Sequence, residues 1–439
     1  TRNSLIQLLN IAGVGPIFGP ILGALYGPVA FVWIVIGCIF AGAVHDYLTG
    51  MISIRNHGAH LPQLAGKFLG KTMKHVVNGF AILLLLLVGT VFVTSPAALL
   101  ANMTSLSLTL IILAIFAYYL IATLLPIDKV IGRIYPYFGA LLLFSAAGIG
   151  IGLVVTGAPI PELSFQNMHP DNAPIFPLLF LTISCGALSG FHATQTPIIS
   201  RTTENETNGR KIFYGMMIAE GVIAMIWAAA AMSLFQGEQS LSDVLAAGGP
   251  AAVVSEVSTT MLGAVGGTLA VLGVIVLPIT SGDTAFRSAR MIIADYLKVE
   301  QKPIVKRILI ALPLFVASYA LTHMDFTLLW RYFSWANQTT AVIALWTGTM
   351  YLVLSRKPYL ITSIPAVFMT MATFTYLAYA PIGFNLPLQT SYIVAALGTL
   401  VCIALFMKRV RRLSRATFSV DEPVPGALDQ DATLATSSR

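Results

Sequence analysis

The chain has 439 residues, of which 56% are hydrophobic and only 10% are charged, and its formal net charge is +7. An ordinary soluble domain is about one quarter charged, so this composition excludes a soluble protein, and the basic excess indicates membrane-flanking loops rather than nucleic-acid binding. Residues 172–200 and 358–407 contain no Asp, Glu, Lys or Arg. Each stretch exceeds the roughly 20 apolar residues that cross a bilayer, and neither alternates with a period of two, which argues against a transmembrane β-barrel. The sequence therefore predicts an all-α polytopic membrane protein.

Apolar stretches predict twelve membrane spans, at residues 5–26, 28–53, 76–100, 106–126, 134–157, 175–199, 212–235, 257–283, 306–322, 326–354, 359–380 and 388–407. Lys and Arg gather in every second loop, and only Arg331 departs from this pattern. By the positive-inside rule, both ends of this segment are predicted to be cytoplasmic. The polar residues 411–439 are predicted to form a disordered cytoplasmic tail.

Two of the predicted spans are interrupted by glycine and proline. The first contains Gly13, Gly15 and Pro16, and the sixth contains Gly186 and Gly190. These residues release backbone groups from the helix, and in hydrocarbon such groups need other partners. Close packing of helices through small residues is the alternative explanation. Interrupted helices at matching places in two halves of a chain indicate a transporter binding site at mid-membrane.

Five spans separate the start of the first interrupted helix from the start of the second. Because five is odd, the second unit enters the membrane from the opposite side. We therefore predict two inverted five-helix repeats at residues 1–157 and 158–355, two peripheral helices at 356–410, and the tail at 411–439.

Charged side chains inside the predicted spans cost roughly 2.5–3.5 kcal/mol each on insertion scales, so each one needs a reason. His45 and Asp46 lie in the second span, Glu220 in the seventh and Asp283 at the end of the eighth. A structural ion pair is the alternative to a functional role, above all for Asp283, which Arg287 follows one helical turn later.

The predicted substrate site combines the two interruptions with polar residues of the sixth and tenth spans. Its members are Gly13, Gly15, Pro16, Gly186, Ser189, Gly190, His192, Gln195, Trp335, Asn337 and Gln338. Backbone N–H groups near Ser189 and Gly190, with His192 and Gln195 as further donors, favour a carboxylate ligand. Sequence alone leaves the choice of carboxylate open.

The predicted ion-coupling site consists of His45, Asp46, Thr280, Ser281, Asp283 and Thr284. Neutral oxygens together with a carboxylate would suit sodium, whereas a proton needs a titratable group. Two carboxylates near the inner end of the spans favour protons. We expect no enzyme activity, no cofactor and no resident metal, and the oligomeric state is left open. The three cysteines lie in apolar runs, where packing roles are expected.

Several motifs closely resemble the carbon starvation protein A family, in its shorter form. They are Gln7–Pro20, Gly42–Asp46, Ser53–Gly58, Gly186–Gln195, Pro278–Arg287 and Trp335–Gln338, and the resemblance covers most of residues 4–355. Members of that family usually begin with a further hydrophobic helix, which this sequence does not show.

The resemblance implies a leucine-transporter-like inverted repeat of the amino acid–polyamine–organocation superfamily. It also implies ion-driven uptake of peptides or pyruvate across the cytoplasmic (inner) membrane during carbon starvation. A nutrient sensor or a channel without ion coupling is the alternative function.

Overall fold

The computed structural model describes residues 2–124, 128–236, 240–415 and 419–420. These segments fold into helices, and the only β pairing among them is an isolated bridge between Gln236 and Ser240. The first half contains α1 (Arg2–Ile11), α2 (Gly15–Gly23), η1 (Ala24–Tyr26), α3 (Val29–Ile36), η2 (Gly37–Gly42), α4 (Ala43–Arg55), α5 (Leu61–Phe68), α6 (Lys71–Met103), α7 (Leu108–Leu124) and α8 (Asp128–Val155). The second half contains α9 (Ile175–Thr182), α10 (Gly190–Ser200), η3 (Glu206–Asn208), η4 (Arg210–Tyr214), α11 (Gly215–Leu234), α12 (Leu241–Leu297), α13 (Ile304–Leu321), α14 (Phe326–Leu354), α15 (Leu360–Tyr379) and α16 (Leu388–Ser414).

Seven of the described helical stretches are long and apolar enough to cross a membrane, and an eighth is formed if α1 and α2 count as one span bent by 46°. The protein is therefore an all-helical, multi-pass membrane protein. Helix also occupies most of the described residues of the remaining predicted spans, but the total of twelve crossings stays a prediction. Of the predicted tail, α16 includes residues up to Ser414, and residues 421–439 lie outside the described part of the chain.

The predicted eighth span, residues 257–283, is the middle of a much longer helical stretch, α12, which has 57 residues. Two kinks divide α12, at Gly249 with φ of 64° and at Gly263 with φ of 68°. Only glycine adopts this backbone conformation readily. The sequence pattern marked the apolar centre of α12 but not its helical extensions, because those extensions are amphipathic or polar.

Both predicted helix interruptions are present. Residues 12–14 separate α1 from α2, and residues 183–189 separate α9 from α10. Pro16 sits in the first turn of α2, where its missing N–H is not needed. In the second interruption Gly186 has φ of +88°, and the Ile183 carbonyl accepts a hydrogen bond from Trp33 Nε1 at 3.0 Å.

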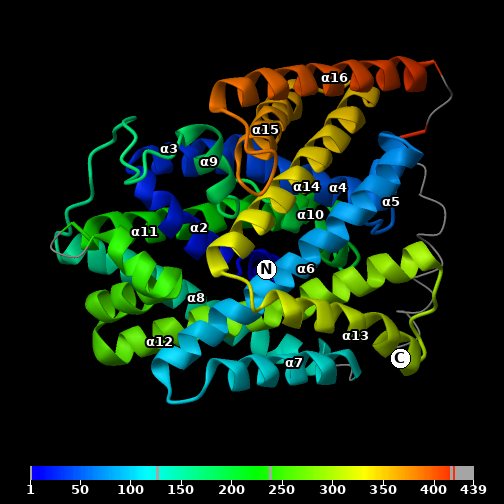
Figure 1. Cartoon of the computed structure of the whole chain (residues 1–439). Helices are drawn as coiled ribbons and strands as arrows, with labels where there is room; N and C mark the ends of the chain where they lie inside the picture. Colours follow the sequence, from blue (N-terminus) through cyan, green and yellow to red (C-terminus); the bar gives the residue numbers. More distant parts are fainter. Residues whose placement is uncertain (1, 125–127, 237–239, 416–418, 421–439) are drawn as a thin grey trace.

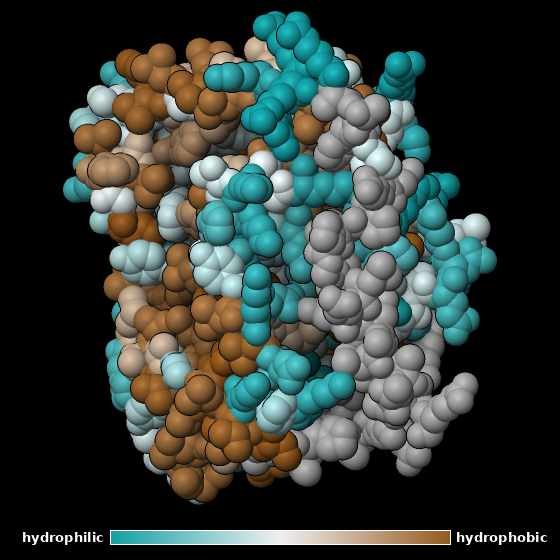
Figure 2. Space-filling model, turned by 90° about the vertical axis from the view of Figure 1, so that its right-hand side faces the viewer, coloured by the Kyte–Doolittle hydropathy of each residue, from teal (hydrophilic) through white to brown (hydrophobic). Residues whose placement is uncertain are grey.

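The interrupted helices lie in the middle of the molecule, where α1 and α2 pack against α10, α11 and α12. In Figure 1, α15 and α16 lie along one edge, and α7 and α13 lie along the opposite edge. The outer helix α16 exposes Ile393, Leu397 and Leu400 on one face, as expected for a helix that contacts lipid. Figure 2 shows hydrophilic residues gathered on the face seen from the right of Figure 1, beside a flank of hydrophobic residues.

Arg201 binds the loop between α4 and α5, beside the buried side chain of His60. Arg201 donates to the Gly58 carbonyl from both Nε and Nη2, at 3.1 and 3.0 Å, and its Nη2 lies 3.2 Å from His60 Nε2. Burial, with a smaller effect of the Arg201 charge, lowers the pKa of His60 from 6.5 to about 3. His60 Nε2 is therefore an unprotonated acceptor in the folded protein.

This histidine predicts a loss of stability in acid. Below pH 6.5 the unfolded chain binds a proton at His60 that the folded chain does not, so the free energy of unfolding falls by at most about 1.4 kcal/mol per pH unit down to pH about 3. Above pH 6.5 this contribution no longer changes. Thermal unfolding of the purified protein between pH 7.5 and 5 should show a steeper decline for the wild type than for His60→Asn. Equal slopes for the two proteins would show that His60 is not held neutral by the fold.

Candidate functional site

The two helix interruptions meet at the centre of the structure. A Cβ atom added to Gly15 would lie 2.4 Å from Cys185 Sγ, and one added to Gly186 would lie 3.8 Å from the Pro16 Cα. Glycine is therefore required where the first interrupted segment crosses the second. The crossing places unwound backbone of two distant parts of the chain beside the helix α11, since a Cβ on Gly186 would also meet Ala224 at 2.5 Å.

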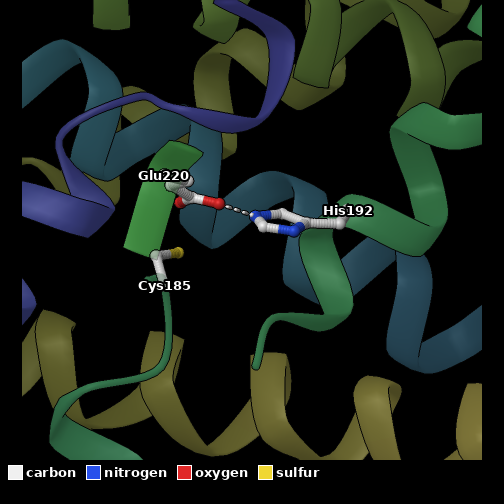
Figure 3. Close-up of side chains that lie close together, drawn as sticks. All are labelled: Cys185, His192 and Glu220. Atoms are coloured by element: carbon white, nitrogen blue, oxygen red, sulfur yellow. Dashed lines mark ion pairs between the residues drawn. The ribbon is translucent and has the colours of Figure 1, made fainter. Parts of the chain in front are cut away.

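A chain of ionisable side chains runs next to this crossing. Asp46 on α4 is the centre: its Oδ1 lies 2.8 Å from His45 Nδ1 and its Oδ2 lies 2.8 Å from His192 Nδ1. The other ring nitrogen of His192, Nε2, lies 3.3 Å from Glu220 Oε2. All four side chains are buried. Figure 3 shows the Glu220 carboxylate directed at the His192 ring, with the Cys185 thiol to one side.

Local structure explains how these groups are aimed at one another. Asp46 lies in the first turn of α4, directly after the π-helical turn η2. Single π-helical turns are frequent at functional sites. The Thr49 hydroxyl donates to the carbonyls of His45 and Asp46, at 2.9 and 3.1 Å. His192 lies in the first turn of α10, immediately after the second interruption.

This arrangement places one imidazole between two carboxylates. A protonated imidazole has two N–H donors, and His192 has a carboxylate oxygen within reach of each nitrogen. A buried charge is costly unless it is paired, and an imidazole between two carboxylates is a group that can bind or release a proton.

A metal ion is the other ligand to consider here. Cys185, His192 and Glu220 offer ligand atoms within 4.8 Å of one another. A structural zinc site takes four protein ligands, and the described residues supply three, with Cys185 Sγ also 3.4 Å from the Ser189 hydroxyl.

The predicted substrate residues fall into two groups. In the first, Asn337 on α14 holds the start of α10: its Oδ1 accepts from the Phe191 N–H at 2.7 Å, and its Nδ2 donates to the Ser189 hydroxyl at 3.2 Å. One backbone N–H of this helix start is thus already bound within the protein. Gly190 lies against the Asn337 carbonyl, since an added Cβ would be 2.2 Å away.

The second group is more dispersed. Gln338 Nε2 donates to the Phe180 carbonyl at 3.1 Å, and Trp335 packs edge-on against Phe80. Gln195 Nε2 lies within hydrogen-bond distance of Thr194 and Ser288, whereas its buried Oε1 has no partner among the described residues. Gly13 faces the Phe92 ring, which an added Cβ would approach to 2.3 Å.

The predicted ion-coupling residues on α12 form a separate set. Ser281 Oγ donates to the Leu9 carbonyl of α1 at 3.1 Å, so α12 does contact the end of the first interrupted helix. Thr280 and Thr284 donate to carbonyls of their own helix. Asp283 forms an ion pair with Arg287 at 3.0 Å, one turn away. Among the described hydrogen bonds, none joins these residues to the His45–Asp46 pair.

Two members of the buried cluster were not in the predicted site. Glu220 is a charge inside a predicted span but is not among the predicted site residues, and a packing role is expected for Cys185. The available signal for Glu220 was its position as the sole charged residue between Lys211 and Glu238. Nothing in the sequence indicated that it approaches His192, because α10 and α11 are separated by residues 201–214, which contain the short helical turns η3 and η4.

Comparisons of the sequence with known proteins give a consistent result. The family model of carbon starvation protein CstA matches residues 6–100, 93–247 and 239–376. An uncharacterized membrane protein of Haemophilus influenzae is 52% identical over 302 residues, which cover 56% of this chain and 81% of that one. The peptide transporter CstA of Campylobacter jejuni is 29% identical, covering 49% of this chain and 40% of its own length. The pyruvate/proton symporter BtsT of Escherichia coli is 26% identical, covering 52% and 41%.

These named transporters are longer proteins, and the alignments cover about two fifths of their length. Among solved structures, the manganese transporter of Eremococcus coleocola in complex with an aromatic bis-isothiourea compound aligns with a TM-score of 0.60 over 94% of both chains, at 12% identity. That likeness concerns the fold. The named relatives and the structural neighbours are transporters rather than enzymes.

Proposed function

Because the chain belongs to the carbon starvation protein CstA family, we propose that it is a secondary active transporter for a small carboxylate nutrient, either pyruvate or a small peptide. It acts in the cytoplasmic (inner) membrane as part of the response to carbon starvation. The observation that supports this proposal most is the buried chain of His45, Asp46, His192 and Glu220 beside two crossing helix interruptions. Ionisable side chains buried inside a membrane protein are energetically costly, so four of them at one point indicate a functional site rather than helix packing alone.

The proposed architecture is that of two inverted five-helix repeats, residues 1–157 and 158–355, in a leucine-transporter-like arrangement of twelve spans. Residues 356–410 form two peripheral helices, and both ends of the segment are cytoplasmic. The crossing of the two interrupted helices supports it, since such crossings form the mid-membrane site in transporters of this type. The distribution of Lys and Arg supports the orientation.

The coupling ion in this proposal is the proton. His192 is placed between Asp46 and Glu220, so one proton gained or lost there changes the charge of a buried cluster. His192 lies in the first turn of α10, directly after the second interruption. A change of charge on His192 therefore changes the electrostatic field at that interruption. The α12 hydroxyls near Ser281 are the site that sodium would use if the coupling ion were sodium instead.

Counterflow into proteoliposomes tests the transport function. Vesicles that contain the purified protein and unlabelled pyruvate, or an unlabelled dipeptide, should take up the labelled compound transiently above its external concentration. A carrier exchanges the two pools through one site, so the overshoot is expected without any ion gradient. Protein-free vesicles and vesicles with an uncharged sugar inside are the controls.

The competing functions, a nutrient sensor or a channel, predict a different result. A channel equilibrates the label without an overshoot, and a sensor moves none. Absence of counterflow for pyruvate, lactate, amino acids and dipeptides would overturn the proposal. Counterflow for sugars alone would contradict the carboxylate site while leaving the transporter fold intact.

A further inference from the structure

A second site lies away from the buried cluster, where α4, η4 and the end of α14 meet the start of α15. It is a cavity of about 400 Å³, here named the Arg210–Lys357 cavity after its two outermost basic residues. Its lining residues are hydrophobic, aromatic or basic, and none is acidic. We propose that this cavity binds the headgroup of an anionic phospholipid.

The position of the cavity on α4 separates it from the proposed transport site. Val44, Leu48 and Met51, which line the cavity, repeat at helical spacing and share one face of α4. His45, Asp46 and Thr49 lie on the opposite face and point into the protein. The cavity therefore lies on the face of α4 opposite Asp46, and we infer that it opens toward the membrane surface.

The charge of the cavity favours an anion. Arg55 is already satisfied, since its guanidinium donates to Glu206 and to the Tyr351 hydroxyl. Arg210 and Lys357 are exposed, and neither side chain has a hydrogen bond or an ion pair among the described residues. The cavity is thus lined by the unpaired positive charges of Arg210 and Lys357. Its wall also contains the phenol rings of Tyr47 and Tyr214.

The rim of the cavity is continuous with a lipid-facing surface. Lys357 and Pro358 precede α15, and the next residues, Tyr359, Leu360 and Ile361, are 47%, 57% and 51% exposed. Basic side chains next to exposed apolar ones at a helix end match a phospholipid, which carries its charge beside its acyl chains. A soluble phosphate ester would use the basic groups but not the apolar rim.

Lipid binding to the purified full chain tests the proposal. In native mass spectrometry with phosphatidylglycerol, the wild type should retain the lipid, and the double variant Arg210→Gln/Lys357→Gln should bind it roughly 30-fold more weakly, about fivefold for each basic residue. Phosphatidylcholine should bind both proteins weakly. The variant Lys302→Gln/Lys306→Gln has the same change of charge at exposed residues outside the cavity, and it should behave as the wild type.

Three results would overturn the proposal. The first is equal phosphatidylglycerol binding by the wild type and the Arg210/Lys357 variant. The second is displacement of the lipid by glycerol 3-phosphate or inorganic phosphate at millimolar concentration, which would identify a soluble phosphate as the ligand. The third is a raised KM for transport in the variant whatever the lipid composition, which would place the cavity on the substrate path. Because counterflow needs no anionic lipid, failure of this proposal is distinguishable from failure of the proposed transport.

Discussion

Replacement of Asp46 by asparagine is expected to abolish accumulation of substrate against a gradient while counterflow continues. Asparagine has nearly the same shape and can still accept a hydrogen bond from one of the two histidines, so the packing around α4 is preserved. It cannot carry the negative charge that Asp46 places beside His192, whose Nδ1 lies 2.8 Å from Asp46 Oδ2. The measurement is uptake driven by an imposed pH gradient, compared with counterflow in the same vesicles.

Further variants sharpen this experiment. Glu220→Gln should give the same separation of accumulation from exchange, since Glu220 is the second carboxylate on His192. Glu162→Gln removes a carboxylate from an exposed loop position and should leave both activities unchanged. The variant Asp283→Asn tests the second predicted coupling carboxylate in the same way. If uptake required sodium, ignored a protonophore at fixed membrane potential and survived both Asp46→Asn and Asp283→Asn, the proton would be the wrong ion and the Ser281 region the better site.

The Gly190→Ala variant is expected to lose both stability and transport. A Cβ at this position would lie 2.2 Å from the Asn337 carbonyl oxygen and 2.5 Å from the Ala341 nitrogen. Both are backbone atoms of α14 and cannot rotate away, so α10 and α14 must separate. Overpacking of this kind costs about 1–3 kcal/mol, and it also disturbs the contact between Asn337 and the start of α10. Thermal unfolding in detergent and counterflow are the two measurements.

A matched glycine gives the control. Gly79 lies inside α6, and a Cβ added there meets nothing within 4 Å. Gly79→Ala should therefore leave transport unchanged and stabilise the helix by about 0.5–1 kcal/mol, as expected when alanine replaces glycine in a helix interior. If the Gly190 and Gly79 variants unfolded at the same temperature, the close approach of α10 to α14 would not exist in the native protein.

Much about this protein follows from its sequence. The shortage of charged residues excludes a soluble fold. The apolar runs predict membrane helices, because an unpaired charge in the core of a bilayer is energetically costly. Gly13 and Gly186 marked both helix interruptions, since glycine and proline act on the backbone locally. The family was also recognisable from local motifs, and comparison confirmed it. These properties depend on residues that are close together in the chain.

The tertiary structure alone decided which polar groups meet. His192 and Glu220 are 28 positions apart in the sequence and come from α10 and α11, and Asp46 comes from α4; their contact depends on how three helices pack. The same packing places the predicted coupling residues at two separate points. Asp283 pairs with Arg287 on its own helix, whereas Asp46 contacts His192 on α10. A helix pattern reveals which side of a helix is buried, but the neighbour on that side is chosen by the shapes of all the helices together.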